Sequence, residues 1–456
     1  FEKIVIIPND HQLGSWADVK YFCGYVKNTT GNKEHPFILW IIDLFIYHLN
    51  IQWDALTNKK KDIPIHLLGK WGPREKSKYG WLHEMIAYKM NPEWIVTGNI
   101  SNNLRKAQLK CKITLTKKLT TLNKYLDTPQ IKQCNGNWRF IDFSKVTSIT
   151  MKNQKTSFQN FKKNSDKSER CDKEDRRQCA ENFSNYMKKV KEGNVKINAK
   201  RLNVYQLVQD ALINRENMEN RAVVEEQWKE NSKKNRKLGN IIPMVDTSGS
   251  MECDECIPLY NAMGLGLRIS EKTRDAFKNR ILTFDREPQW LKFDNDQSFC
   301  SKVYDLKEAS WGMNTDFYKA LDLILDVLVS NSIPPKDVED LTLAVFSDMQ
   351  IDGYNGATVE DLNSMFVRIE KKFKKCGYSI PHILFWNLRK TDGFPVKTTQ
   401  KNVTMLSGYS EYLLNVLCER GVDELKKITP YIQLKNILNN DRYKIFDEFM
   451  KNFAEP

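Results

Sequence analysis

The sequence lacks an apolar run long enough to cross a membrane. Its best segment, residues 37–47, is interrupted by Asp43, and a spanning helix needs about 20 apolar residues. Histidine is also scarce, with six residues in 456, and none is spaced to complete a zinc site with Cys253 and Cys256. We therefore expect neither a membrane partner nor structural zinc.

Signatures of catalysis are missing as well. The chain has no glycine loop of the Walker type and no arrangement of nucleophile, histidine and acid. Its ten cysteines are scattered, which is typical of reduced thiols inside a cell. We expect a non-enzymatic, cytoplasmic protein, or a virion component if the source is viral. Because the chain begins with Phe1 rather than Met, a preceding targeting segment remains open.

Charge is divided unevenly along the chain. Residues 1–238 carry 44 Lys and Arg against 25 Asp and Glu, a net charge of +19, whereas the remainder has a net charge of −5. A basic half joined to a mildly acidic half favours a polyanion-binding part and a separate partner-binding part. A well-solvated, lysine-rich surface is the alternative. The length predicts two or three domains.

The first half has the apolar spacing of α-helices, without a clean repeat period. The predicted helices are residues 36–50, 81–90, 104–125, 183–190 and 204–212. Residues 151–177 are lysine-rich and low in hydrophobicity, which predicts a mobile or contact-dependent stretch.

From residue 240 the pattern changes to short apolar runs that alternate with helical segments. The runs are Ile241–Val245, 280–284, 341–346 and His382–Asn387, and the helical segments include 316–330 and Val359–Lys375. This alternation is typical of a doubly wound, mainly parallel sheet. Ligands of such sheets bind beyond the carboxyl ends of the strands. Asp246 and Asp348 stand at two of these ends.

A set of oxygen-bearing residues follows these strands. Asp246, Ser248 and Ser250 form a D-x-S-x-S motif, Thr315 opens a predicted helix, and Asp348 ends a predicted strand. In content, order and spacing the set resembles the metal-ion-dependent adhesion site of von Willebrand factor A domains. Hydroxyl and carboxylate oxygens suit a hard cation, Mg²⁺ or another divalent ion. The alternative is structural: Asp246 caps a helix and the serines satisfy a turn.

The resemblance implies a role for each of these residues. Ser248, Ser250 and Thr315 are the direct or nearly direct ligands, and Asp246 and Asp348 supply negative charge. One coordination position stays open for an acidic side chain of a protein partner. A hydrolase that uses the Mg²⁺ would need a general base, and the sequence offers no candidate for one.

Further motifs resemble the domain-of-unknown-function 2828 family of plants, fungi and large DNA viruses. They are residues 67–73, 134–146 and 191–198, together with 246–251 and 346–350. The resemblance covers nearly the whole chain from about residue 30, with a departure at Thr147, where the family usually has proline. We expect a basic α-helical domain over 1–238, a von Willebrand factor A-like domain over 239–420, and C-terminal helices over 421–456.

That family is similar in architecture to the Ro autoantigen, in which a ring of helical repeats binds small RNAs and a von Willebrand factor A domain closes the ring. The likeness implies RNA binding by the basic half. The candidate contacts are Lys70, Arg105, Lys106, Lys117, Lys118, Lys162, Lys163, Lys233, Lys234, Arg236 and Lys237.

Three functions therefore compete. The first is a scaffold that captures acidic partners through the metal site and binds RNA. The second is a structural or assembly component, for example of a large DNA virus particle, without specific RNA. The third is a metal-dependent hydrolase, which the missing general base disfavours.

Overall fold

A computed structural model describes most of the chain. The described residues are 15–59, 65, 67–97, 101–162, 168–199, 201–233, 235, 237–284, 287–309, 317–349, 359–389, 402–408, 413, 416 and 417. The chain divides into two compact units, residues 1–141 with 429–456, and residues 142–428. The predicted C-terminal helices of 421–456 lie outside the described residues.

The first unit is helical in its described part. Its elements are α2 (Ser15–Thr30), α3 (Pro36–Thr57), α4 (Leu68–Trp71), α5 (Gly80–Met90), α6 (Pro92–Thr97), α7 (Ser101–Tyr125), α8 (Pro129–Cys134) and the 3₁₀ turn η1 (Trp138–Phe140). Helix α7 buries Cys111, Leu115, Leu119 and Leu122, spaced by three or four residues, in a core shared with α3 and α5. This spacing places the four side chains on one helical face, so a lysine-rich helix packs by a single stripe.

The second unit begins with a helical segment. It contains η2 (Phe143–Lys145), α9 (Ser148–Phe158), α10 (Glu174–Lys191), α11 (Val204–Ile213) and α12 (Met218–Ser232). Of the two alternatives expected for 151–177, mobile or contact-dependent, the second describes its first part: α9 buries Met151 and Phe158, and the buried Lys155 Nζ donates to Asp210 Oδ1 at 2.7 Å. A lysine is tolerated there because its charge has a buried carboxylate partner.

A six-stranded sheet follows in the same unit, with the strand order β3-β2-β1-β4-β5-β6. The strands are β1 (Ile241–Val245), β2 (Arg280–Thr283), β3 (Trp290–Lys292), β4 (Thr342–Ser347), β5 (His382–Asn387) and β6 (Val403–Ser407). All neighbours are parallel except β2 and β3. The chain leaves β1 toward β2 and returns on its other side at β4, so the ends of β1 and β4 form a topological switch point.

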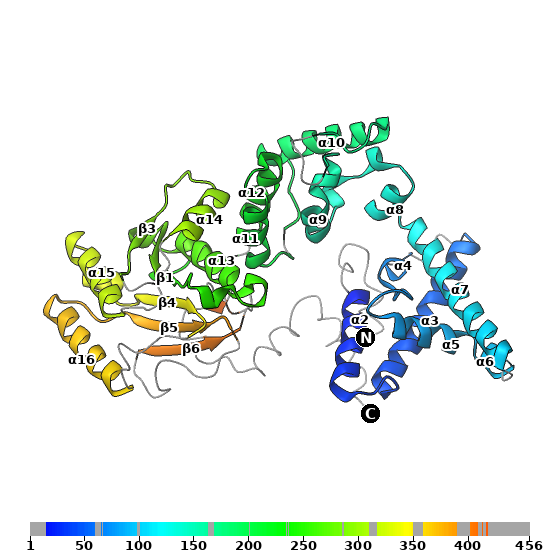
Figure 1. Cartoon of the computed structure of the whole chain (residues 1–456), viewed down its shortest axis with the longest axis horizontal. Coiled ribbons are helices and arrows are strands. Elements are labelled where there is room, and N and C mark those ends of the chain that lie inside the picture. The colour runs from blue at the N-terminus through cyan, green and yellow to red at the C-terminus, as the bar shows by residue number, and fades with distance from the viewer. Residues whose placement is uncertain are drawn as a thin grey trace, which may run out of the picture. The chain divides into compact units, whose positions relative to one another are not determined.

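Helices cover both faces of this sheet (Figure 1). They are α13 (Ile257–Lys272), α14 (Phe299–Glu308), α15 (Phe317–Ser330) and α16 (Val359–Lys375). Val245 and Phe346 face the core that contains α13 and α14, whereas Met244 and Val345 face the core that contains α15. Each inner strand is therefore buried on both sides, as its nearly continuous apolar sequence requires.

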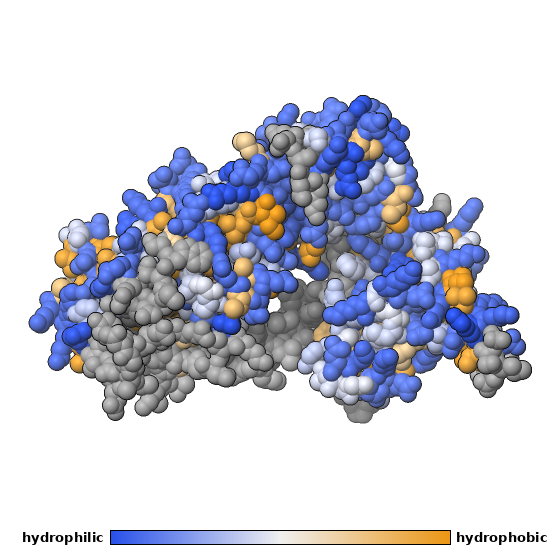
Figure 2. Space-filling model, in the orientation of Figure 1, coloured by the Kyte–Doolittle hydropathy of each residue, from blue (hydrophilic) through white to orange (hydrophobic). Residues whose placement is uncertain are grey.

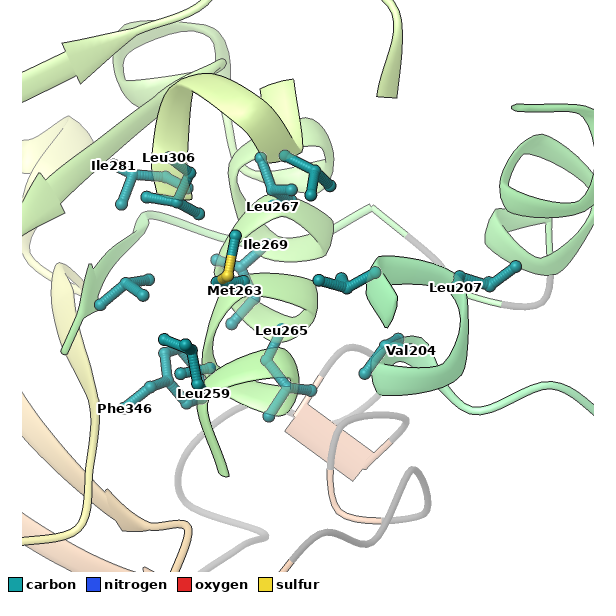
Figure 3. Close-up of a cluster of buried hydrophobic side chains, with 14 of the residues drawn as sticks. Val204, Leu207, Leu259, Met263, Leu265, Leu267, Ile269, Ile281, Leu306 and Phe346 are labelled. Atoms are coloured by element: carbon teal, nitrogen blue, oxygen red, sulfur yellow. The ribbon is translucent and has the colours of Figure 1, made fainter. Parts of the chain in front are cut away.

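Helix α13 lies between the sheet and α11. Figure 3 shows its apolar side chains between Val204 and Leu207 of α11 and Ile281 and Phe346 of the strands. The carboxylate of Glu225 in α12 also accepts hydrogen bonds from Phe299 N and Cys300 N, at 3.0 and 2.8 Å, at the start of α14. The boundary predicted after residue 238 thus lies inside the second unit.

The predicted combination of a helical part and a doubly wound, mainly parallel sheet is confirmed. Within the described ranges, no helix is long and apolar enough to cross a membrane. Figure 2 shows mostly hydrophilic residues on the visible face, with hydrophobic ones in small patches.

Substitution of Gly266 tests the packing that holds α13 on β1. A Cβ atom there would lie 2.4 Å from Val245 Cγ2, so we expect Gly266→Ala to lower the free energy of unfolding by about 1–3 kcal/mol. Gly249→Ala is the control, because a Cβ at Gly249 meets nothing within 4 Å. Urea unfolding measures both, and equal stability of the two variants would contradict the packing argument.

Candidate functional site

The candidate site lies at the carboxyl ends of β1 and β4. These strands pair in parallel with Val245 opposite Phe346, and Asp246 N extends the pairing by donating to Phe346 O at 3.0 Å. Asp246 and Asp348 follow the two strands directly. Both are almost fully buried, with 2% and 1% of their surfaces exposed, so two carboxylates are held near each other beneath the surface.

Hydrogen bonds compensate part of the burial of Asp246. Its Oδ1 accepts from Ser248 N at 2.8 Å, and its Oδ2 accepts from the Ser347 hydroxyl at 2.6 Å. Burial raises the pKa of Asp246, the hydrogen bonds from Ser347 and Ser248 lower it, and the charge of Asp348 raises it again. The two carboxylates therefore repel each other where little water screens them.

The two serines of the D-x-S-x-S motif are more exposed than this pair of carboxylates. Ser248 and Ser250 are half-buried, and their hydroxyls are hydrogen-bonded to each other with the Oγ atoms 3.0 Å apart. Two oxygens bound at right angles to Mg²⁺, each at about 2.1 Å, are separated by about 3.0 Å. The hydroxyl pair thus has the spacing of neighbouring ligands of one cation.

The structural alternative explains only part of this arrangement. The hydrogen bond from Ser248 N to Asp246 is the turn that this alternative predicts. A turn needs neither a second buried carboxylate nor two adjacent hydroxyls. The donor set consists of oxygens alone, which suits Mg²⁺ or another hard cation.

Arg389 is a residue that sequence reasoning missed. It follows β5, the strand beside β4, and its Nη1 lies 3.3 Å from Asp348 Oδ2. The sequence could have indicated this residue. The strand at His382–Asn387 was predicted, and a residue just beyond a parallel strand lies at the same edge of the sheet. Ser347 was also missed as a partner of Asp246, since its side-chain contact depends on the register of β1 with β4.

The structure thus brings Asp246, Ser248, Ser250 and Asp348 to one edge of the sheet, and Thr315 lies outside the described residues. Within the part of the chain that the structure describes, no three His, Cys, Asp or Glu residues form a metal-holding group. A cation would therefore depend on hydroxyl and water ligands in addition to the two carboxylates. The metal remains a prediction.

The basic candidates fall in both units. Lys70, Arg105, Lys106, Lys117 and Lys118 belong to the first unit, and Lys162, Lys233 and Lys237 to the second. Lys163, Lys234 and Arg236 lie outside the described residues.

Some of these cationic side chains already bind other residues of the protein. Lys118 Nζ donates to Asn50 Oδ1 at 2.9 Å, and Lys233 Nζ lies 2.6 Å from Glu230 Oε2. Arg105, Lys106 and Lys117 are exposed on α7. Contact of any of these side chains with nucleic acid remains a prediction.

Two family models match the chain. Residues 25–241 match "Domain of unknown function (DUF2828)", and residues 240–448 match "Domain of unknown function (DUF7788)". The first match confirms the resemblance drawn from the motifs at 67–73, 134–146 and 191–198, whereas the motifs at 246–251 and 346–350 lie in the second match. The two models meet at residues 240–241, close to the predicted boundary.

An uncharacterized protein of Acanthamoeba polyphaga mimivirus is 26% identical over 419 residues, which cover 89% of this chain and 68% of that protein. Among solved structures, the Ro protein of Deinococcus radiodurans overlaps 89% of this chain and 92% of its own, with 11% identity and a TM-score of 0.32.

Substitution of Ser347 tests the support of the buried carboxylate. Ser347→Ala leaves Asp246 Oδ2 without its 2.6 Å donor, so we expect a loss of about 1.5–3 kcal/mol in the free energy of unfolding. The control is Ser270→Ala, at a serine that is also fully buried. Its hydroxyl donates to the helical carbonyl of Leu267, a bond whose loss should matter little. The measurement is urea unfolding at neutral pH. Similar losses of unfolding free energy in the two variants would mean that Ser347 does not stabilise the buried carboxylate of Asp246.

Proposed function

We propose that this protein is a non-enzymatic binding scaffold with two kinds of site. A divalent cation, most simply Mg²⁺, is held at the carboxyl edge of the sheet and captures an acidic side chain of a protein partner. The basic helical part binds RNA. The observation that carries the first site is a pair of half-buried hydroxyls, 3.0 Å apart, in the loop that follows the buried Asp246, whose strand pairs with the one that ends before the buried Asp348.

Charge and accessibility support this assignment. Asp246 and Asp348 place two negative charges in a buried position, and Arg389 Nη1 lies 3.3 Å from Asp348 Oδ2. Among the described members of the set, Ser248 and Ser250 are the accessible ones. When bound, the cation supplies an open coordination position that a partner's carboxylate can occupy.

The surroundings favour capture over hydrolysis. Hydrolysis at a metal site needs a general base within hydrogen-bonding reach of the attacking water. Asp246 is engaged by Ser248 and Ser347, and Asp348 faces Arg389. The chain's residues here would hold the cation, and the cation would bind the partner's carboxylate; we assign them that role.

Metal binding is tested by calorimetry with MgCl₂ or MnCl₂ on the chelator-treated full chain. We expect one site in the wild type and none in Asp246→Ala or Ser250→Ala, because each substitution removes an oxygen from the set. Asp296→Ala, which removes an exposed carboxylate of the same unit, should bind as the wild type does. Metal should also stabilise the wild type, by about 2.7 kcal/mol at 100 times its dissociation constant. Unaltered binding in Asp246→Ala would exclude this site.

Partner capture is tested with a displayed peptide library on the immobilised chain. Peptides retained in Mg²⁺ and released by chelator should share an Asp or Glu. Changing that residue to Asn or Gln should abolish binding, because the amide lacks the charge that the cation attracts. Peptides that bind equally without metal, or to Asp246→Ala, would contradict the proposed capture.

A further inference from the structure

The conspicuous basic cluster of the first unit surrounds Trp71, at the end of α4. Lys20 Nζ donates to Trp71 O at 3.2 Å and lies 5.7 Å from the centre of the indole ring. Lys70 Nζ lies 5.5 Å from the same ring. Arg74 Nη2 donates at 2.6 Å to the carbonyl oxygen of Gly69, two residues before Trp71 in the chain. The three cations, one from α2 and two from the segment 70–74, therefore lie around the backbone of residues 69–71.

Among the described residues, none of these three cations pairs with a carboxylate. Other lysines of this unit do: Lys89 Nζ lies 2.7 Å from Asp43, Lys112 Nζ 2.8 Å from Glu84, and Lys132 Nζ 3.1 Å from Asp127. Lys20, Lys70 and Arg74 are instead half-buried. Such a cluster of like charges destabilises the free protein and suits an anionic ligand.

The pKa values agree with this picture. Burial lowers the pKa of Lys20, Lys70 and Arg74, and the charge of Arg74 lowers that of Lys20 further. A lowered pKa of a lysine or arginine means that its environment disfavours the charged form. A phosphate oxyanion bound at these side chains would offset part of that penalty.

Close packing holds the cluster in place. A Cβ atom on Gly69 would lie 2.7 Å from Leu122 Cβ, and one on Gly72 would lie 2.8 Å from Leu119 Cδ2. The backbone that carries Lys70 and Trp71 therefore lies directly on α7, which only glycine at these two positions permits. A site held in this way loses little conformational entropy when a ligand binds.

Exposed aromatic side chains lie on α2, the helix that carries Lys20. Tyr21, Phe22 and Tyr25 of α2 are 55%, 50% and 67% exposed, although large apolar rings are usually covered. Lys20, on the same helix, has its Nζ 5.9 Å from the Tyr21 ring and 5.4 Å from the Tyr79 ring. Tyr21 packs edge-on against the buried Tyr79, with ring centres 5.8 Å apart. Tyr21 thus adjoins the basic cluster, and Phe22 and Tyr25 are exposed within the next turn of the same helix.

We propose that this basic–aromatic site, formed by Lys20, Lys70 and Arg74 with Tyr21, Phe22 and Tyr25, binds single-stranded nucleic acid. The cations hold backbone phosphate, and the exposed rings stack on unpaired bases. This assignment rests on the proposed function, since it gives the predicted nucleic-acid binding a location and a strand class. Cations alone would serve any polyanion, but exposed rings add affinity only where bases are unstacked and free.

The charge part is tested by fluorescence anisotropy of a labelled 12-nucleotide oligo(U) with the full chain at low salt. Lys20→Gln/Lys70→Gln should weaken binding at least about tenfold. It should also reduce the slope of log affinity against log salt by about 1.4, since each lost phosphate contact on a single strand contributes about 0.7. Arg74 is left intact because it supports the Gly69 carbonyl.

The matched control is Lys89→Gln/Lys132→Gln. It removes the same charge from the same unit, at lysines that already have carboxylate partners, and should bind within about twofold of the wild type. Thermal unfolding of each variant verifies that it is folded.

The aromatic part has its own test. Phe22→Ser/Tyr25→Ser should weaken oligo(U) binding about tenfold or more without changing the salt slope, because stacking involves no ion release. Phe140→Ser, also an exposed ring of this unit at 58%, should have little effect. The RNA duplex of equal length should bind the wild type more weakly than the single strand and should not distinguish Phe22→Ser/Tyr25→Ser from the wild type.

The outcomes separate this site from the proposed function. If the wild type binds oligo(U) and the cluster variants behave as the controls do, the site is wrong while nucleic-acid binding stands. If the duplex binds as tightly as the single strand, the strand class is wrong. If the wild type retains no RNA at low salt, both this site and the proposed RNA binding are overturned.

Discussion

The parallel pairing of β1 with β4 is the constraint on which the candidate metal site depends. With Val245 opposite Phe346, the next residue of each strand comes to the same edge, and Ser347 reaches Asp246. A shift of one residue would turn Ser347 to the other face of the sheet and separate it from the carboxylate. That register is in turn fixed by burial, because Val245 and Met244 fill different cores. The geometry of the edge thus follows from apolar packing on two faces.

Much of this arrangement could be predicted from the sequence. The apolar runs at Ile241–Val245 and His382–Asn387 mark β1 and β5 at their observed limits. Strands buried on both faces are nearly all apolar, so they stand out from their neighbours. Asp246 and Asp348 follow two such runs, and parallel strands place their carboxyl ends at one edge. The two acidic residues of the site could therefore be predicted without knowledge of side-chain contacts.

Other features depend on contacts that no local pattern records. β3, Trp290–Lys292, is short and half-exposed, so its sequence has little periodicity to detect. Lys155 looked like part of a solvated stretch because its partner, Asp210, is 55 residues away. Arg389 and Ser347 acquire their roles from neighbouring strands. In each case the missing information is the tertiary partner, which spacing along the chain cannot supply.

Each of the two proposed sites is a group of like charges held close together, negative in the first site and positive in the second. Asp246 and Asp348 are like charges held together by strand pairing, and Lys20 and Arg74 are like charges held together by helix packing. Each cluster costs stability in the free protein, since the remaining partners compensate it only in part. Elsewhere the chain avoids this cost, as with Lys155 and Asp210, by pairing a buried charge with its opposite. We infer that the acidic pair at the edge of the sheet and the basic cluster beside Trp71 are the positions where a ligand of opposite charge would relieve the most repulsion.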